Sequence, residues 1–141
     1  MFARILFPVD LEEESSWQKS MPTVVNLRQA FGSELHVLTI TPEWPQGMFR
    51  LGLPADIERR FAAAAAERLD AFVREHIPEG VAVTKHVRVG RVYRMILEAA
   101  AEIGADLIVM ASHRPEMGDY LIGANASRVV RHADVSVLVI R

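Results

Sequence analysis

The apolar residues of the chain gather in five short runs that predict β-strands. Residues 4–9 and 106–111 are apolar almost throughout, which is typical of strands buried on both faces of a parallel sheet. Residues 34–41 and 135–140 are also rich in apolar residues. Residues 81–88 instead alternate apolar and polar positions, which favours a less buried strand at the edge of a sheet.

Four stretches between these runs carry apolar residues at helical spacing. They predict helices over residues 16–31, 55–76, 91–103 and 123–132. Pro22 lies inside the first stretch, so we expect either a kink there or a later start of the helix. In the second stretch, the residues at steps of four that we expect to face the core are Ile57, Phe61, Ala65, Leu69 and Val73.

The predicted strands and helices alternate along the chain, which indicates one α/β domain over residues 1–141. This order favours a doubly wound parallel sheet with helices on both faces. The two most apolar strands, residues 4–9 and 106–111, should be adjacent at its centre. Such sheets bind ligands beyond the carboxyl ends of the strands, where the strand order reverses. Asp10 and residues 111–114 therefore lie at the mouth of the expected site.

Composition narrows the classes of function. The 141 residues include 16 Lys and Arg and 18 Asp and Glu, a formal net charge of −2. This balance lacks the basic surplus of a nucleic-acid-binding domain. The absence of cysteine excludes disulfides, thiolate metal sites and a Cys nucleophile, and it fits a cytoplasmic protein. The histidines show no metal-ligand spacing, so no metal site is predicted, and His36 and His86 are interpreted as residues on a strand surface. We expect no membrane span and no targeting segment.

The segment after residues 106–111 is the best candidate for a binding site. A polar loop leads to Gly123, Ala124 and Asn125, which open the last predicted helix. A helix N-terminus presents unpaired N–H groups and a positive dipole, so it can bind a phosphate, and Arg114 adds a bidentate donor. The alternative is that Gly123 is only a turn residue and Asn125 only a cap. By itself the pattern favours this alternative.

Five segments match one family of small α/β proteins in sequence, order and spacing. They begin with Ile-Leu-Phe-Pro-Val-Asp and lie at residues 5–10, 35–40, 90–96, 105–110 and 123–139. On these segments nearly the whole chain resembles the universal stress protein (UspA-like) family. The resemblance implies a Rossmann-like, five-stranded parallel sheet in the order 3-2-1-4-5, of the adenine-nucleotide alpha hydrolase type. It further implies a cytoplasmic stress-response protein that binds ATP, with or without Mg²⁺.

The loop departs from the family's ATP-binding pattern, which is Gly-x-x-Gly, nine residues, then Gly-Ser or Gly-Thr. Here Ala111 and Arg114 stand at the positions of the two loop glycines. Only eight residues separate Arg114 from Gly123, and Ala124 replaces the hydroxyl residue. On the strict pattern these changes argue against ATP. The stretch Ala-Ser-His-Arg-Pro at residues 111–115, however, resembles the small F-type branch of the family, which is associated with ATP binding.

The resemblance implies a role for each matching residue. Asp10 corresponds to a carboxylate that accepts bonds from a ribose hydroxyl, and its alternative is a turn residue after the first strand. Ile40 corresponds to an apolar residue under the adenine, with plain core as an equal alternative. Arg114 would clamp a phosphate or shield the site, or it is a solvated loop residue. The implied nucleotide-binding residues are Pro8, Val9, Asp10, Ile40, Met110, Ala111, Ser112, His113, Arg114, Gly123, Ala124 and Asn125.

The last strand is apolar and is expected at the edge of the sheet, where an uncovered strand invites pairing with a second copy. The resemblance implies a two-fold homodimer through Val137, Leu138, Val139 and Ile140. A covered edge is the alternative.

The expected function is that of a stress-response regulator with an adenine nucleotide between its first and fourth strands. The alternative is a nucleotide-free homodimer that acts only through protein partners. Because no general base, metal cage or phosphate-loop lysine is evident, at most slow ATP hydrolysis is expected. A hydrolase built on Ser112 and His113 is disfavoured, since adjacent side chains in an extended loop point apart. The apolar loop at residues 42–53 is expected to form a lid, a partner patch or a higher-order contact.

Overall fold

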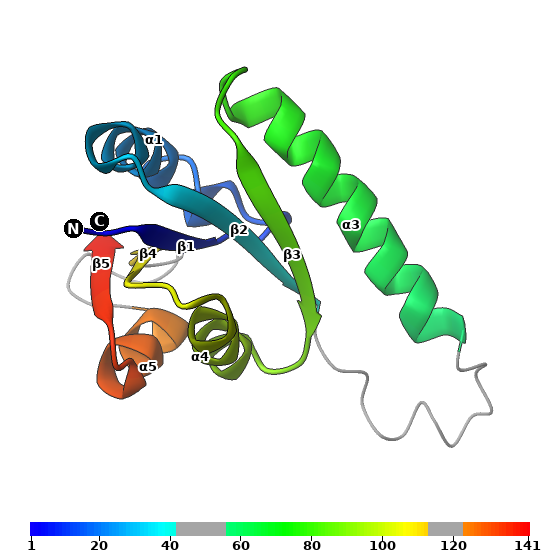
Figure 1. Cartoon of the computed structure of the whole chain (residues 1–141). Helices are drawn as coiled ribbons and strands as arrows, with labels where there is room; N and C mark the ends of the chain where they lie inside the picture. Colours follow the sequence, from blue (N-terminus) through cyan, green and yellow to red (C-terminus); the bar gives the residue numbers. More distant parts are fainter. Residues whose placement is uncertain (42–55, 113–122) are drawn as a thin grey trace.

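The computed structural model describes residues 1–41, 56–112 and 123–141, and its core is a five-stranded parallel sheet (Figure 1). The order is β3-β2-β1-β4-β5, which confirms the predicted α/β class and strand order. The predicted loop at residues 42–53 and the site residues His113 and Arg114 lie outside the described residues. The strands are β1 (Arg4–Pro8), β2 (Glu34–Thr41), β3 (Val83–Val89), β4 (Leu107–Ala111) and β5 (Ser136–Ile140).

The helices form a layer on each face of the sheet. α1 and α3 cover one face, and α4 and α5 cover the other (Figure 1). The sequence therefore winds in two directions from β1, as a doubly wound sheet requires. The helices are the 3-10 turn η1 (Glu14–Ser16), α1 (Ser20–Phe31), α3 (Asp56–His76), α4 (Val92–Ile103) and α5 (Ala124–His132).

α1 begins later than its apolar pattern does, which is one of the two outcomes expected from Pro22. The first helical residue is Ser20, so Pro22 lies in the first turn. N–H groups in the first turn have no acceptor within the helix, and a proline there costs little. The helix ends at Gly32, whose φ of 64° is left-handed and suits a residue without a Cβ.

β1 is buried on both of its faces. Ile5, Leu6 and Phe7 have no exposed surface, and β1 lies between β2 and β4. Ile5 and Phe7 belong to the core beneath α1 and α3, whereas Leu6 belongs to the core beneath α4 and α5. Side chains of a strand alternate between its faces, so a strand covered on both must be apolar throughout. This explains the unbroken apolar run near the start of the chain.

Only part of the expected apolar stripe of α3 reaches the core. Ala65 and Leu69 are buried, as predicted, but Phe61 is 50% exposed. The first turns of α3 extend past the carboxyl end of β3 (Figure 1). Their apolar residues therefore have no sheet beneath them, and periodicity alone gives no measure of where a sheet ends.

Two histidines on neighbouring strands form a pair, which corrects their interpretation as surface residues. His36 of β2 is only 8% exposed, and its Nδ1 lies 2.8 Å from Nε2 of His86 on β3. Glu34 Oε2 lies 3.4 Å from the other ring nitrogen of His36. Burial, followed by the charges of His36 and Arg88, lowers the pKa of His86. The hydrogen bond needs one ring nitrogen as donor and the other as acceptor, so the pair is not stable with both rings protonated.

This pair predicts a loss of stability in mild acid. Because the pKa of His86 is lowered in the folded protein, the unfolded chain binds more protons once the pH falls below about 6.5. The free energy of unfolding should therefore decrease between about pH 7.5 and pH 5.5, where Asp and Glu are still ionised. His86→Gln should make that decrease smaller. Urea denaturation at both pH values measures it.

The matched control is His132→Gln, because His132 is exposed on α5. It should leave the pH dependence of the wild-type protein unchanged. An equal decrease in the His86→Gln protein and the wild type would show that the pair does not carry the effect.

Candidate functional site

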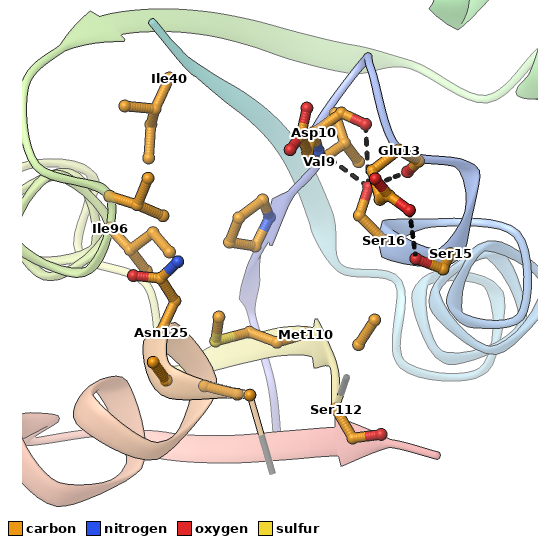
Figure 2. Close-up of a pocket in the computed structure, with 16 residues that line it drawn as sticks. Val9, Asp10, Glu13, Ser15, Ser16, Ile40, Ile96, Met110, Ser112 and Asn125 are labelled. Carbon is orange, nitrogen blue, oxygen red and sulfur yellow. Dashed lines mark hydrogen bonds between the residues drawn. The ribbon is translucent and has the colours of Figure 1, made fainter. Parts of the chain in front are cut away.

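A pocket opens beyond the carboxyl ends of β1 and β4, as the strand order predicts (Figure 2). Its volume is about 430 Å³, which suits a small organic ligand. After β1 the chain turns to η1 and α1 on one face, whereas the segment after β4 leads to α5 on the other face. The two connections diverge, and the pocket occupies the space between them.

Apolar side chains form one wall of the pocket. Ile40 comes from the end of β2, Met110 from β4, and Val92 and Ile96 from the first two turns of α4. Ile40 and Ile96 lie opposite Asp10, Ser15 and Ser16 (Figure 2). Such a wall can bury the face of a flat, weakly polar ring.

The opposite wall is a hydrogen-bonded turn that holds Asp10 in place. The N–H of Asp10 donates to Ser16 Oγ over 2.9 Å, and that hydroxyl lies 2.7 Å from the carbonyl oxygen of Glu13 and 3.0 Å from that of Asp10. Asp10 Oδ1 accepts the N–H of Glu12 over 3.0 Å. The carboxylate is thus fixed through one oxygen, and it is exposed enough for the other to accept a bond from a ligand.

The start of α5 supplies the positive end of the pocket. Gly123 is the N-cap, no side chain caps the helix, and its first turn holds no acidic residue. The N–H groups of Ala124, Asn125 and Ala126 therefore have no acceptor within the helix. Together with the helix dipole they can bind an anionic group.

In the structure, the N–H of Gly123 is not available to the nucleotide that the resemblance assigns to this residue. Its N–H donates to the carbonyl oxygen of Ser112, which brings the last residue before the undescribed segment to the first residue after it. Ser112 is itself bound to the sheet, since its N–H donates to the carbonyl oxygen of Ile140 on β5 over 2.8 Å. The N–H of Gly123 is therefore not available to a ligand. The N–H of Ala126 is available in its place, in addition to those of Ala124 and Asn125.

The pocket gathers every predicted site residue that the structure describes. These residues are Pro8, Val9, Asp10, Ile40, Met110, Ala111, Ser112, Gly123, Ala124 and Asn125. Sequence reasoning missed six others that line it: Glu13, Ser15, Ser16, Val92, Ile96 and Ala126. Val92 and Ile96 were detectable as neighbours one helical turn apart, but the sequence does not show which helix end meets the pocket. Ser16 is the first residue of the helix predicted over residues 16–31, but in the structure it lies in η1, with Ser15, before α1 begins.

Comparison with known proteins identifies the family. The model of the Universal stress protein family matches residues 1–141. Universal stress protein G of Shigella flexneri is 35% identical over 147 residues, with all of both chains covered. Universal stress protein G of Salmonella typhimurium is 33% identical over 144 residues, again with all of both chains covered. The chain belongs to the universal stress protein family.

Solved structures of universal stress proteins share the fold. Universal stress protein UspA from Lactobacillus plantarum superposes with a TM-score of 0.71 at 24% identity, covering 99% of this chain and 98% of that one. A universal stress protein in complex with cAMP superposes with a TM-score of 0.62 at 20% identity, covering 99% and 97%. At these identities the likeness establishes the architecture.

Among residues 1–41, 56–112 and 123–141, no group of three or more His, Cys, Asp and Glu is arranged to hold a metal ion. In the same ranges, none of the helices combines the length and the apolar character needed to cross a membrane.

The turn around Ser16 generates a prediction about stability. Ser16→Ala removes the acceptor of the Asp10 N–H and should lower the free energy of unfolding by about 1–2 kcal/mol. Ser15→Ala is the matched control, because Ser15 Oγ only approaches Glu13 Oε1 at 3.4 Å. It should cost less than about 0.5 kcal/mol. Urea denaturation followed by circular dichroism measures both, and equal costs would contradict the role given to Ser16.

Proposed function

We propose that this universal stress protein binds ATP or a related adenine nucleotide in the pocket between β1 and β4, and that it acts as a stress-response regulator in the cytoplasm. One observation carries the proposal. The pocket combines an apolar wall, a fixed carboxylate and an uncapped helix N-terminus, which match a base, a sugar and a phosphate in turn. Cell fractionation tests the location.

The proposed arrangement places each part of the nucleotide against one element. The adenine lies on Ile40 and Met110, and a ribose hydroxyl donates to the free oxygen of Asp10. The phosphates lie at the start of α5, where the N–H groups of Ala124 and Asn125 donate to them. Since Ala124 carries no hydroxyl, backbone groups provide the phosphate contacts at that position.

Binding, rather than rapid turnover, is the activity proposed. The described lining offers two carboxylates, three serine hydroxyls and an amide, but no Lys, Arg or His. Phosphoryl transfer depends on cations that neutralise the developing charge, and the described part of the lining supplies none, which favours a ligand that stays bound. The relative solved with cAMP makes cyclic AMP a second ligand to test, because a single phosphate also fits one helix N-terminus.

Two substitutions should alter ligand preference in different ways. Asp10→Ala removes the sugar contact and should weaken ATP and adenosine alike, by about tenfold or more. Ala124→Asp places a carboxylate in the first turn of α5, where it favours the helix but repels a phosphate. It should abolish ATP binding and leave adenosine binding unchanged. Isothermal titration with ATP plus Mg²⁺, cyclic AMP and adenosine measures these affinities.

Asp134→Ala is the control, because Asp134 is exposed beyond the far end of α5. It should bind all three ligands as the wild type does. Absence of binding by the folded wild-type protein would overturn the proposal and select the nucleotide-free alternative. Equal loss of ATP and adenosine in Ala124→Asp would refute the phosphate position alone.

We also propose that two copies pair through β5. β5 is an edge strand that pairs with β4, and its residues 137–140 are all half-buried within the single chain. An apolar strand at an open edge presents backbone groups that a second copy can pair with. Leu138 already contacts the core on the α1 side, so substituting it would also disturb folding. Val139 is part of neither core cluster and is the cleaner position to test.

Val139→Lys should convert the dimer to a monomer, because a charge on an edge strand opposes strand pairing. Analytical ultracentrifugation measures the mass. Thr84→Lys is the matched control, since Thr84 is exposed on β3 at the opposite edge of the sheet. It should sediment as the wild type. A wild-type monomer, or a dimer in the Val139→Lys protein, would contradict pairing through β5.

A further inference from the structure

Three arginines and a histidine lie around one tyrosine where α4 and α5 lie side by side (Figure 1). The Arg128 guanidinium lies 5.3 Å from the centre of the Tyr93 ring, and the His132 ring centre lies 6.2 Å from it. Arg91, the N-cap of α4, and Arg94 in its first turn flank Tyr93 in the sequence. We call Arg91, Tyr93, Arg94, Arg128 and His132 the Tyr93 cluster. The three arginines and His132 are exposed, and Tyr93 is half-buried.

The charges of the Tyr93 cluster are not neutralised within the described part of the chain. Four basic residues elsewhere are paired with carboxylates: Arg4 with Glu34, Arg68 with Glu12, Lys85 with Asp70, and Arg88 with Glu102. No ion pair involves a member of the cluster in residues 1–41, 56–112 and 123–141. Glu98 and Asp134, the acidic residues closest to the cluster in sequence, form none with it.

Two members of the Tyr93 cluster, Arg91 and Arg94, are placed against the dipole of α4, whereas His132 lies in the last turn of α5, where a basic residue is favoured. Arg91 is the N-cap of α4 and Arg94 lies in its first turn, which holds no acidic residue. The positive end of a helix disfavours cations by a few tenths of a kcal/mol each. A local arrangement that opposes both the dipole and charge balance is expected where a partner supplies the compensation.

The geometry within the cluster prepares it for carboxylates. Stacking on Tyr93 orients the planar guanidinium of Arg128, so less freedom is lost when its N–H groups bind a carboxylate. Arg91, followed by Arg94, lowers the pKa of the Tyr93 hydroxyl, because a nearby guanidinium favours the phenolate. Tyrosine and arginine are the residue types that contribute most to protein interfaces.

We propose that the Tyr93 cluster docks an acidic segment of a protein partner. Carboxylates of that segment would accept bonds from Arg94 and Arg128, and an apolar side chain beside them would lie on the Tyr93 ring. The Tyr93 cluster spans two adjacent helices, and a surface of that extent is one that a short peptide can contact as a whole. A nucleic acid or an anionic membrane offers repeated phosphates rather than an apolar side chain beside carboxylates, so each is a poorer match for the Tyr93 ring.

The docking surface is distinct from the nucleotide pocket. None of the five cluster residues lines the pocket, although their neighbour Val92 does. The proposal therefore stands whether or not a nucleotide binds, and the two can fail separately.

The test uses the full chain and a fluorescein-labelled peptide of about twelve residues, mostly Glu with a central pair of Leu. Fluorescence anisotropy should show binding that weakens as salt is raised. The double variant R94E/R128E should bind about tenfold or more weakly, because its new carboxylates repel those of the peptide. The neutral variant R94Q/R128Q should weaken binding less, because it removes the charges without reversing them. Circular dichroism checks that both variants are folded. Tyr93→Ala should weaken it while leaving the salt dependence in place.

R60E/R74E is the matched control, because it makes the same change of charge at exposed positions of α3 on the other face of the sheet. It should retain peptide binding. The proposal is overturned if the wild type does not bind the peptide or if the control loses binding equally. It is also overturned if single-stranded oligo(dT) or phosphatidylserine vesicles bind the cluster more tightly than the peptide. Loss of ATP binding in R94Q/R128Q would instead assign the cations to the nucleotide and overturn docking.

Discussion

The burial of β1 on both faces is the constraint on which the rest of the structure depends. Because β1 lies between β2 and β4, the helices that follow β1 cover one face of the sheet, and the helices later in the chain cover the other face. The helices that follow β1 and β4 therefore separate at the carboxyl edge of the sheet. The pocket is a consequence of that separation, and its apolar floor is the end of the same buried core.

Charge is unevenly divided between the two helical layers. On the side of α1 and α3, carboxylates are paired with basic residues, as in Arg68 with Glu12 and Lys85 with Asp70. On the side of α4 and α5, both helices start at the same edge of the sheet and neither has an acidic residue in its first turn. Within the described residues, the starts of α4 and α5 thus carry no carboxylate, and the pocket and the Tyr93 cluster approach them from different sides.

The sheet could be predicted closely because its signal lies in the chain itself. A strand buried on both faces has to be apolar at every position, so residues 4–9 and 106–111 identified the centre, and the family resemblance supplied the full strand order. The site residues at strand ends followed from that order. Asp10 could be predicted from its position directly after β1. Ala124 and Asn125 could be predicted from their position at the start of a helix.

What could not be predicted depends on contacts between distant segments. The pairing of His36 with His86 joins two strands across a register that no sequence pattern reveals. The exposure of Phe61 depends on where the sheet ends beneath α3. The shift of donors from Gly123 to Ala126 depends on a single carbonyl, that of Ser112, which lies 11 positions earlier in the chain. In each case the residue type was visible, but its partner was not.

Ser112 has a further consequence for how this fold can diversify. Its N–H is bound to β5 and its carbonyl to Gly123, so the chain enters and leaves residues 113–122 at two fixed points. Both bonds lie within the described residues, so they fix the two ends of the segment 113–122 at the rim of the pocket. We expect a change in the length or sequence of that segment to leave the two anchoring bonds in place, so that ligand preference can change without a change in the sheet.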